Sequence, residues 1–230
     1  MDWTDLLFMH WPVPAASLRP FIPAGLELDL HQGQAWVAVV PFRMSGVRAR
    51  FLPELPGLSA FPELNVRTYV TRGGTPGVWF FSLDAASRIA VRGARQFFHL
   101  PYFDARIGFS RPARSGGPDE IRYRSHRTHR GAPDADLEVT YAPTGPAFRA
   151  TAGSLDDWLT ARYCFYAADG EGAILRATVH HKPWRLQPAR AEIHRNAMTV
   201  QIGLELPAAP PLLLYSERTE VVGWMPERLG

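Results

Sequence analysis

Polar and hydrophobic residues alternate along residues 63–70, and this is the clearest pattern in the chain. The positions of one parity are Leu64, Val66, Thr68 and Val70, and those of the other are Glu63, Asn65, Arg67 and Tyr69. Because successive side chains of a β-strand point to opposite faces, the segment predicts a strand with one apolar and one polar face. The polar face either points into a lined cavity or borders the core as an ordinary solvent face, and both interpretations stay open.

The segment that follows predicts the partner of this strand. Residues 72–77 (RGGTPG) supply the glycines and proline of a turn, and residues 78–83 (VWFFSL) are apolar on both faces. A strand of this kind is usually covered on both sides. We therefore expect a hairpin over residues 61–85, around which the rest of the chain is organised.

The remaining pattern predicts an α+β fold that is mostly antiparallel β, with about ten short strands and two helices. One helix is expected from Asp84 or Ser87 to about Phe98, and a second from Ser154, because these residues can cap a helix. The other strands are expected at residues 1–13, 35–44, 102–109, 121–128, 137–141, 174–180, 191–194, 198–206, 212–215 and 220–224. Residues 45–60, rich in proline and glycine, are expected to form an exposed loop that covers a site lined by the hairpin.

The composition favours one domain over residues 1–230. The chain is 46% hydrophobic and 20% charged, with a formal net charge of +3. Its single cysteine, Cys164, excludes an internal disulfide and is typical of a reducing compartment. The sequence shows neither a signal peptide nor an apolar run of the roughly 18 residues that span a bilayer. We therefore expect a soluble, cytoplasmic protein with no membrane partner.

Most named chemistries lack their motifs in this sequence. It contains no glycine-rich phosphate loop, no paired Cys/His metal motif and no nucleophile elbow, so neither a cofactor nor a metal is expected. His180 and His181 are adjacent, but neighbouring side chains on a strand point apart and rarely bind one metal. Residues 121–130 are basic and would suit a nucleic-acid backbone or a solvated edge hairpin. The small net charge favours the hairpin, so no nucleic-acid partner is expected.

Eight segments match motifs of a known family. They are LRPFIPAGLELD (18–29), AWVAVVPFRM (35–44), FPELNVRTYV (61–70), GVWFFSLDAASR (77–88), LPYFDARI (100–107), RYCFY (162–166), HHKPWRLQPA (180–189) and LLLYSERTEVVGWMPERL (212–229). Over nearly the whole chain these segments resemble the YqjF-like bacterial family of unknown function. That family resembles acetoacetate decarboxylase in fold. The resemblance implies an antiparallel cone or barrel around a small-molecule cavity, with about two flanking helices and often a homo-oligomer.

The same resemblance implies where a site lies. The catalytic glutamate of the decarboxylase follows an aromatic residue by two positions, as Glu63 follows Phe61 here. Its lysine pair corresponds to Tyr102 and Phe103, so both lysines are missing. The arginine that binds its substrate would fall near Thr4, where this chain has none. Without an amine there is no imine to act as electron sink, and acetoacetate decarboxylase activity is not expected.

We therefore expect a small-molecule-binding protein, or an enzyme of unknown reaction, whose ligand is a carboxylate or keto acid. Arg67 would hold the carboxylate, Glu63 would orient substrate or act as general base, and Tyr102 would donate a hydrogen bond. The other residues expected to line the cavity are Asn65, Trp79 and Trp184.

Two alternatives stay open at this point. The chain would be an interaction or scaffold protein if aromatic side chains fill the interior and leave no ligand site. It would be a decarboxylase if its single lysine, Lys182, reached the cavity and formed the imine.

Overall fold

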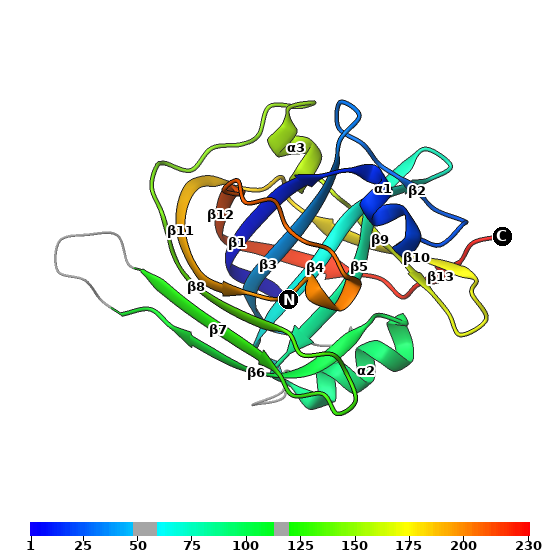
Figure 1. The fold of residues 1–230 in the computed structure, drawn as a ribbon, viewed down its shortest axis with the longest axis horizontal. Helices are drawn as coiled ribbons and strands as arrows, with labels where there is room; N and C mark the ends of the chain where they lie inside the picture. The colour runs from blue at the N-terminus through cyan, green and yellow to red at the C-terminus, as the bar shows by residue number, and fades with distance from the viewer. Residues whose placement is uncertain (48–58, 113–119) are drawn as a thin grey trace.

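The computed structural model describes residues 1–47, 59–112 and 120–230, and Figure 1 shows their arrangement. One sheet contains thirteen strands. They are β1 (Asp2–Val13), β2 (Glu27–Leu28), β3 (Ala35–Ser45), β4 (Phe61–Arg72), β5 (Thr75–Ala85), β6 (Tyr102–Ser110), β7 (Ile121–Arg127), β8 (Asp136–Pro143), β9 (Cys164–Ala168), β10 (Ile174–His181), β11 (Gln187–Asn196), β12 (Leu212–Gly223) and β13 (Glu227–Arg228). The α-helices are α1 (Ala15–Leu18), α2 (Arg88–Phe98) and α3 (Leu155–Thr160), and Arg19–Phe21 and Val200–Ile202 are 3₁₀ turns.

The strand pairings close this sheet into two rings that share one wall. The shared wall is β12–β1–β3–β4–β5, in which every neighbouring pair is antiparallel. On one side β9 and β10 connect β5 back to β12, which gives a seven-strand ring. On the other side β6, β7, β8 and β11 connect the same two strands, which gives a nine-strand ring. Each ring therefore has its own interior.

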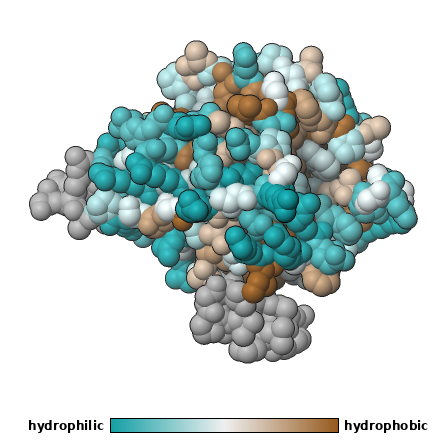
Figure 2. Space-filling view, turned by 60° about the horizontal axis from the view of Figure 1, so that its bottom comes forward, coloured by the Kyte–Doolittle hydropathy of each residue, from teal (hydrophilic) through white to brown (hydrophobic). Residues whose placement is uncertain are grey.

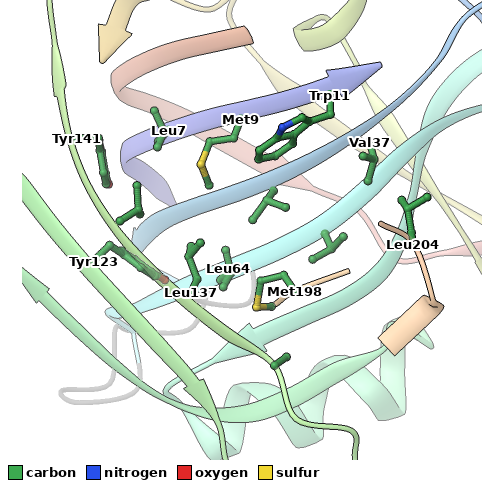
Figure 3. Close-up of a cluster of buried hydrophobic side chains, with 14 of the residues drawn as sticks. Leu7, Met9, Trp11, Val37, Leu64, Tyr123, Leu137, Tyr141, Met198 and Leu204 are labelled. Atoms are coloured by element: carbon green, nitrogen blue, oxygen red, sulfur yellow. The ribbon is translucent and has the colours of Figure 1, made fainter. Parts of the chain in front are cut away.

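The interior of the nine-strand ring is a hydrophobic core. Figure 3 shows side chains of the shared wall, such as Leu7, Met9 and Leu64, facing Tyr123 and Tyr141 across the ring. These side chains are buried, and the wall residues have one parity along each strand. The alternation along β4 predicted this apolar face, which contains Leu64 and Val66.

The opposite face of the shared wall fills the seven-strand ring. Its apolar side chains include Leu6, Phe8, Ala38, Val40 and Phe42 from the wall, and Ala167, Leu175 and Trp184 from the far side. Because both faces of the wall are covered, its strands carry the near-continuous apolar runs expected of buried strands. The predicted central position of residues 35–44 and the predicted hairpin at 61–85 are confirmed.

Two short helices lie at opposite ends of the molecule (Figure 1). The Ser87 hydroxyl caps α2 by accepting from Ala90 N at 3.3 Å, and the Ser154 hydroxyl caps α3 by accepting from Asp157 N at 3.3 Å. Both caps were expected from the sequence. Through Leu159 and neighbouring residues, α3 packs on the end of the seven-strand ring around Tyr69.

Two predictions about strands were wrong, and a predicted loop lies mostly outside the described residues. Residues 198–206 form no strand, because Met198 N bonds to the Asn196 side chain in a local turn and Gly203 is left-handed with φ 60°. The strands expected at 212–215 and 220–224 are one strand, β12, since the residues between them also pair with β1. The covering loop expected at 45–60 lies mostly at residues 48–58, outside the described residues.

Gly77 lies where β5 meets β9 and closes the seven-strand ring, and we expect a larger residue there to destabilise the fold. A Cβ added to Gly77 on β5 would lie 2.7 Å from Cys164 Sγ, 2.8 Å from Tyr166 Cε2 and 3.0 Å from Cys164 O. Since the backbone oxygen cannot move aside cheaply, Gly77→Ala is expected to lower the free energy of unfolding by about 1–3 kcal/mol in urea denaturation. Gly93→Ala in α2 is the matched control, because nothing lies within 4 Å of its added Cβ. It should be neutral or stabilising by up to about 1 kcal/mol, and equal effects of the two variants would contradict the prediction.

Candidate functional site

The polar face of β4 points into the seven-strand ring. Glu63, Asn65 and Arg67 stand directly opposite Phe42, Val40 and Ala38 on β3, which belong to the core of that ring. Directly opposite residues of paired strands share a face. The exposed fractions of Glu63, Asn65 and Arg67 are 3%, 5% and 8%. Of the two interpretations of this face, a solvent-exposed surface is thus excluded.

Glu63 and Tyr102 form a buried pair between β4 and β6. The Tyr102 hydroxyl donates to Glu63 Oε2 at 2.8 Å, and the Tyr123 hydroxyl donates to the Glu63 backbone oxygen at 2.7 Å. Burial raises the pKa of Glu63 to about 8, the Tyr102 hydrogen bond opposes this rise, and the charge of Asp84 adds to it. Burial also raises the pKa of Tyr102 well above its usual range. At neutral pH both groups therefore hold their protons, and Glu63 is an acid able to donate one.

Arg67 is a buried cation with an incomplete set of partners. Its Nε has no hydrogen-bond partner, and no ion pair joins Arg67 to any carboxylate of the described chain. Its guanidinium carbon lies 5.5 Å from the centre of the Phe8 ring and 5.9 Å from that of the Tyr69 ring. Burying a charge without a counter-charge is costly, so this arrangement suits an anionic ligand.

The structure adds His10 and Tyr69 to this group. His10 Nε2 and the Tyr69 hydroxyl are 2.7 Å apart, and both residues are fully buried. Burial and the nearby Arg67 charge hold the pKa of His10 well below its usual range, so the imidazole is neutral. The only sequence signal for His10 is that it interrupts an apolar strand.

Together with Arg67 Nε, four other polar side-chain atoms inside the same ring have no hydrogen-bond partner among the residues that the structure describes. They are His10 Nδ1, Asn65 Oδ1, Ser216 Oγ and Trp3 Nε1. Ser216 stands opposite Leu6, and Trp3 packs on Phe42 and Trp184, so both belong to this interior. Most buried polar groups in proteins are hydrogen-bonded, and a cluster of exceptions indicates a place where a ligand or ordered water binds.

The structure does not bring all of the expected lining residues together. Trp184 lies in the ring interior, with Nε1 donating to Thr160 O at 2.8 Å. Trp79 stands opposite Thr68 and packs on the outer cluster that contains Val70, so it points away from Arg67. Lys182 is exposed in the segment between β10 and β11, outside the buried group.

Neither histidine of the pair at 180–181 lies in a metal-binding cluster of the described chain, which contains no group of three or more candidate ligands. His181 is buried, and its ring nitrogens lie 2.9 Å from Lys182 O and 3.3 Å from Arg162 O.

On the basic hairpin of residues 121–130, Arg124 pairs with Glu138 and His126 with Asp136. This face therefore carries interleaved opposite charges, unlike a uniformly basic surface that would follow a phosphate backbone.

Figure 2 shows a face on which hydrophilic residues surround smaller hydrophobic patches. Within residues 1–47, 59–112 and 120–230, no helix has the length and apolar character needed to cross a membrane.

Comparison of the sequence with known proteins gives a clear match. A model of DUF2071, a family described as an uncharacterized conserved protein, matches residues 1–220. The uncharacterized protein YqjF of Bacillus subtilis (strain 168) is 46% identical over 222 residues, which cover 96% of this chain and 88% of that protein. The expected resemblance to a YqjF-like family is confirmed.

Comparison of the structure with solved structures shows the fold. Acetoacetate decarboxylase from Legionella pneumophila matches with a TM-score of 0.63 at 12% identity, covering 100% of this chain and 88% of that chain. An acetoacetate decarboxylase-like enzyme from Sphingomonas wittichii RW1 matches at 0.61 and 15% identity, covering 99% and 92%. The enduracididine biosynthesis enzyme MppR, complexed with pyruvate, matches at 0.59 and 16% identity, covering 100% and 87%. The expected fold, a mostly antiparallel sheet of the acetoacetate decarboxylase type, is confirmed.

Proposed function

The chain belongs to the DUF2071 family of uncharacterized conserved proteins, and we propose that it binds a small organic carboxylate inside the seven-strand ring. One observation carries the proposal. Arg67 is 8% exposed, its Nε lacks a partner, and no carboxylate of the described chain neutralises it. A carboxylate ligand would supply both the missing acceptor and the missing charge.

The side chains around Arg67 suit a small ligand. Ala38 lies between Arg67 on β4 and His10 on β1 in the register of the wall, and its methyl group is the smallest side chain in that row. The aromatic rings of Phe8 and Tyr69 flank the guanidinium group. A charged group at one end and apolar walls around it are typical of sites for small organic acids.

Glu63 lies farther along β4, where it is hydrogen-bonded to Tyr102 of β6. Residues four apart on one face of a strand have Cα atoms roughly 13 Å apart. An acid as short as pyruvate, held by Arg67, would therefore not reach the Glu63 carboxyl unless the arginine leaned toward it. We propose Glu63 and Tyr102 as contacts for the far end of a longer acid, where the protonated Glu63 would donate a hydrogen bond or a proton.

A structural relative gives independent support for the ligand class. MppR, whose fold is similar to that of this chain, has been solved with pyruvate bound. At 16% identity this says nothing of the residues here, but it is a precedent for a small keto acid in a protein of this fold.

A protein without a ligand is the second candidate, and aromatic packing favours it. The Trp184 ring centre lies 5.2 Å from that of Phe8 and 6.2 Å from that of Trp3, so aromatic side chains fill part of the interior. That candidate leaves the partner-less Arg67 unexplained, and we therefore rank it second. The exposed position of Lys182 gives no support to a decarboxylase that forms an imine there.

A thermal-shift titration with pyruvate, acetate and acetamide tests the proposal. We expect an acid to raise the midpoint of unfolding of the wild type by about 5–10 °C at 100 times its Kd, and acetamide to leave it unchanged. Arg67→Met should abolish the shift. Without ligand this variant should be as stable as the wild type or up to about 4 kcal/mol more stable, because a buried charge is removed.

Arg122→Met is the matched control, since Arg122 is exposed on β7. It should keep the full ligand shift. If a broad set of carboxylates leaves the wild type unshifted, the carboxylate proposal is rejected and the ligand-free candidate takes its place.

A further inference from the structure

We propose that His10 is the second hydrogen-bond donor to the ligand carboxylate, which it binds together with Arg67 across Ala38. The inference rests on the proposed function, because it concerns the same ligand. It assigns a role to a residue on β1, a strand to which the sequence pattern attached no chemistry.

The register places the two side chains on either side of Ala38. His10 stands opposite Ala38, and Ala38 stands opposite Arg67. Neighbouring strands are about 4.8 Å apart, so His10 and Arg67 start roughly 10 Å apart with only a methyl group between them. The proposal places the ligand carboxylate over this methyl group, between the two longer side chains.

Two aromatic rings lie close to both His10 and Arg67. The Phe8 ring centre is 5.9 Å from that of His10 in a nearly parallel stack, and 5.5 Å from the Arg67 guanidinium carbon. The Tyr69 ring centre is 6.1 Å from that of His10 and 5.9 Å from the same carbon. His10, Arg67, Phe8 and Tyr69 therefore form one buried cluster beside Ala38.

The charges around Tyr69 favour one position for the proton on His10. The guanidinium carbons of Arg67 and Arg162 lie 5.9 Å and 4.9 Å from the centre of the Tyr69 ring, and a hydroxyl beside cations turns its lone pairs toward them and its proton away. The Tyr69 proton then points to His10 Nε2, which is 2.7 Å from the hydroxyl oxygen. A neutral imidazole that accepts at Nε2 carries its proton at Nδ1. His10 Nδ1 is buried and has no acceptor in the described chain, so it is a donor that a ligand oxygen could satisfy.

These donors select for an ionised carboxylate. Arg67 Nε–H and His10 Nδ1–H both donate, and a carboxylate has two oxygens that only accept. An amide would turn its NH₂ group toward one of the donors. The charge of the carboxylate would neutralise Arg67, so His10 need not become charged when the ligand binds.

Two substitutions of His10 separate hydrogen bonding from packing. In His10→Asn the amide nitrogen can take the place of Nδ1, because both atoms are bonded to Cγ. In His10→Gln the amide reaches the place of Nε2 and leaves that of Nδ1 empty. Calorimetric titration with pyruvate is expected to give a Kd about 10- to 100-fold weaker for His10→Gln than for the wild type. His10→Asn should bind at least about tenfold more tightly than His10→Gln, and circular dichroism confirms that both variants are folded.

The other possible results distinguish a failure of the role of His10 from a failure of the proposed function. If His10→Gln binds pyruvate as tightly as the wild type while Arg67→Met does not bind it, the role of His10 is rejected and the proposed function stands. If both His10 variants are weakened equally, the imidazole acts through packing, and its role as a donor is rejected. If pyruvate and the other acids do not bind the wild type, the proposed function fails and the role of His10 fails with it.

Discussion

Arg127→Met is expected to lower the free energy of unfolding by about 3–5 kcal/mol. Arg127 donates to Asp84 through Nε and Nη2, each at 2.7 Å, and both side chains are only 1% exposed. Removal of the arginine would leave the Asp84 carboxylate buried without its counter-charge. Burial already raises the pKa of Asp84, and the hydrogen bond and charge of Arg127 are the main opposing influences. Urea denaturation followed by circular dichroism measures the loss.

Arg124→Met on the same strand is the matched control for Arg127. Arg124 pairs with Glu138 at the surface, where its side chain is 75% exposed, so this substitution should change stability by at most about 1 kcal/mol. Similar effects of the two substitutions would contradict the prediction. The comparison with Arg67→Met is also informative, because Arg67 is buried like Arg127 and lacks the carboxylate.

The stability of the wild type, measured relative to Glu63→Gln, is expected to fall as the pH rises from about 5 to about 8. Below the ordinary pKa of 4.5, Glu63 is protonated in both the folded and the unfolded state. Between 4.5 and about 8 the unfolded state releases this proton while the folded state keeps it, so each rise in pH favours unfolding. Above about 8 the folded state loses the proton as well, and the decline ends. The total loss across this window is about 3–5 kcal/mol.

Urea denaturation of both proteins at several pH values between 4 and 9 tests the dependence on Glu63. Glutamine is neutral throughout, so the difference between the two curves isolates the carboxyl group from other titrating groups. Tyr102→Phe removes the hydrogen bond that lowers the pKa of Glu63, so the decline should start at the same pH but end at a higher one. If the stability of the wild type and that of Glu63→Gln change with pH in the same way, Glu63 has the same pKa in the folded and the unfolded state, and the prediction is wrong.

The features that the sequence predicted are those that depend on neighbouring residues. The alternation at residues 63–70 predicted both faces of β4, since each residue of a strand turns its side chain to the side opposite its neighbours. The caps at Ser87 and Ser154 could be predicted because a helix start needs only a few consecutive residues. The sequence also restricted any lysine chemistry to one residue, Lys182, but it did not show where that residue lies relative to the site.

Bulges explain why other features could not be predicted. Between Val66 and Arg67 the pairing of β4 with β5 shifts by one residue, so that Leu83 and Phe80 face the same interior. Counting by twos from Leu83 places Trp79 inside the ring, but the bulge turns it outward. On β1 the pairing with β3 shifts between Thr4 and Met9, which sets the face on which His10 lies. A bulge results from the pairing of two distant segments, and the residue pattern of one strand does not reveal it.

β12 has a consequence for how the chain reaches this structure. It pairs with β1, β10 and β11, and both rings close through it. The contact between Asp2 and Glu220 joins residues that are more than 200 positions apart. During synthesis, β1 can pair with β3 early, but its other edge has no partner until nearly all of the described chain has been translated. A nascent chain of this topology exposes open strand edges for most of that time, and its folding is expected to be slow and dependent on protection from aggregation.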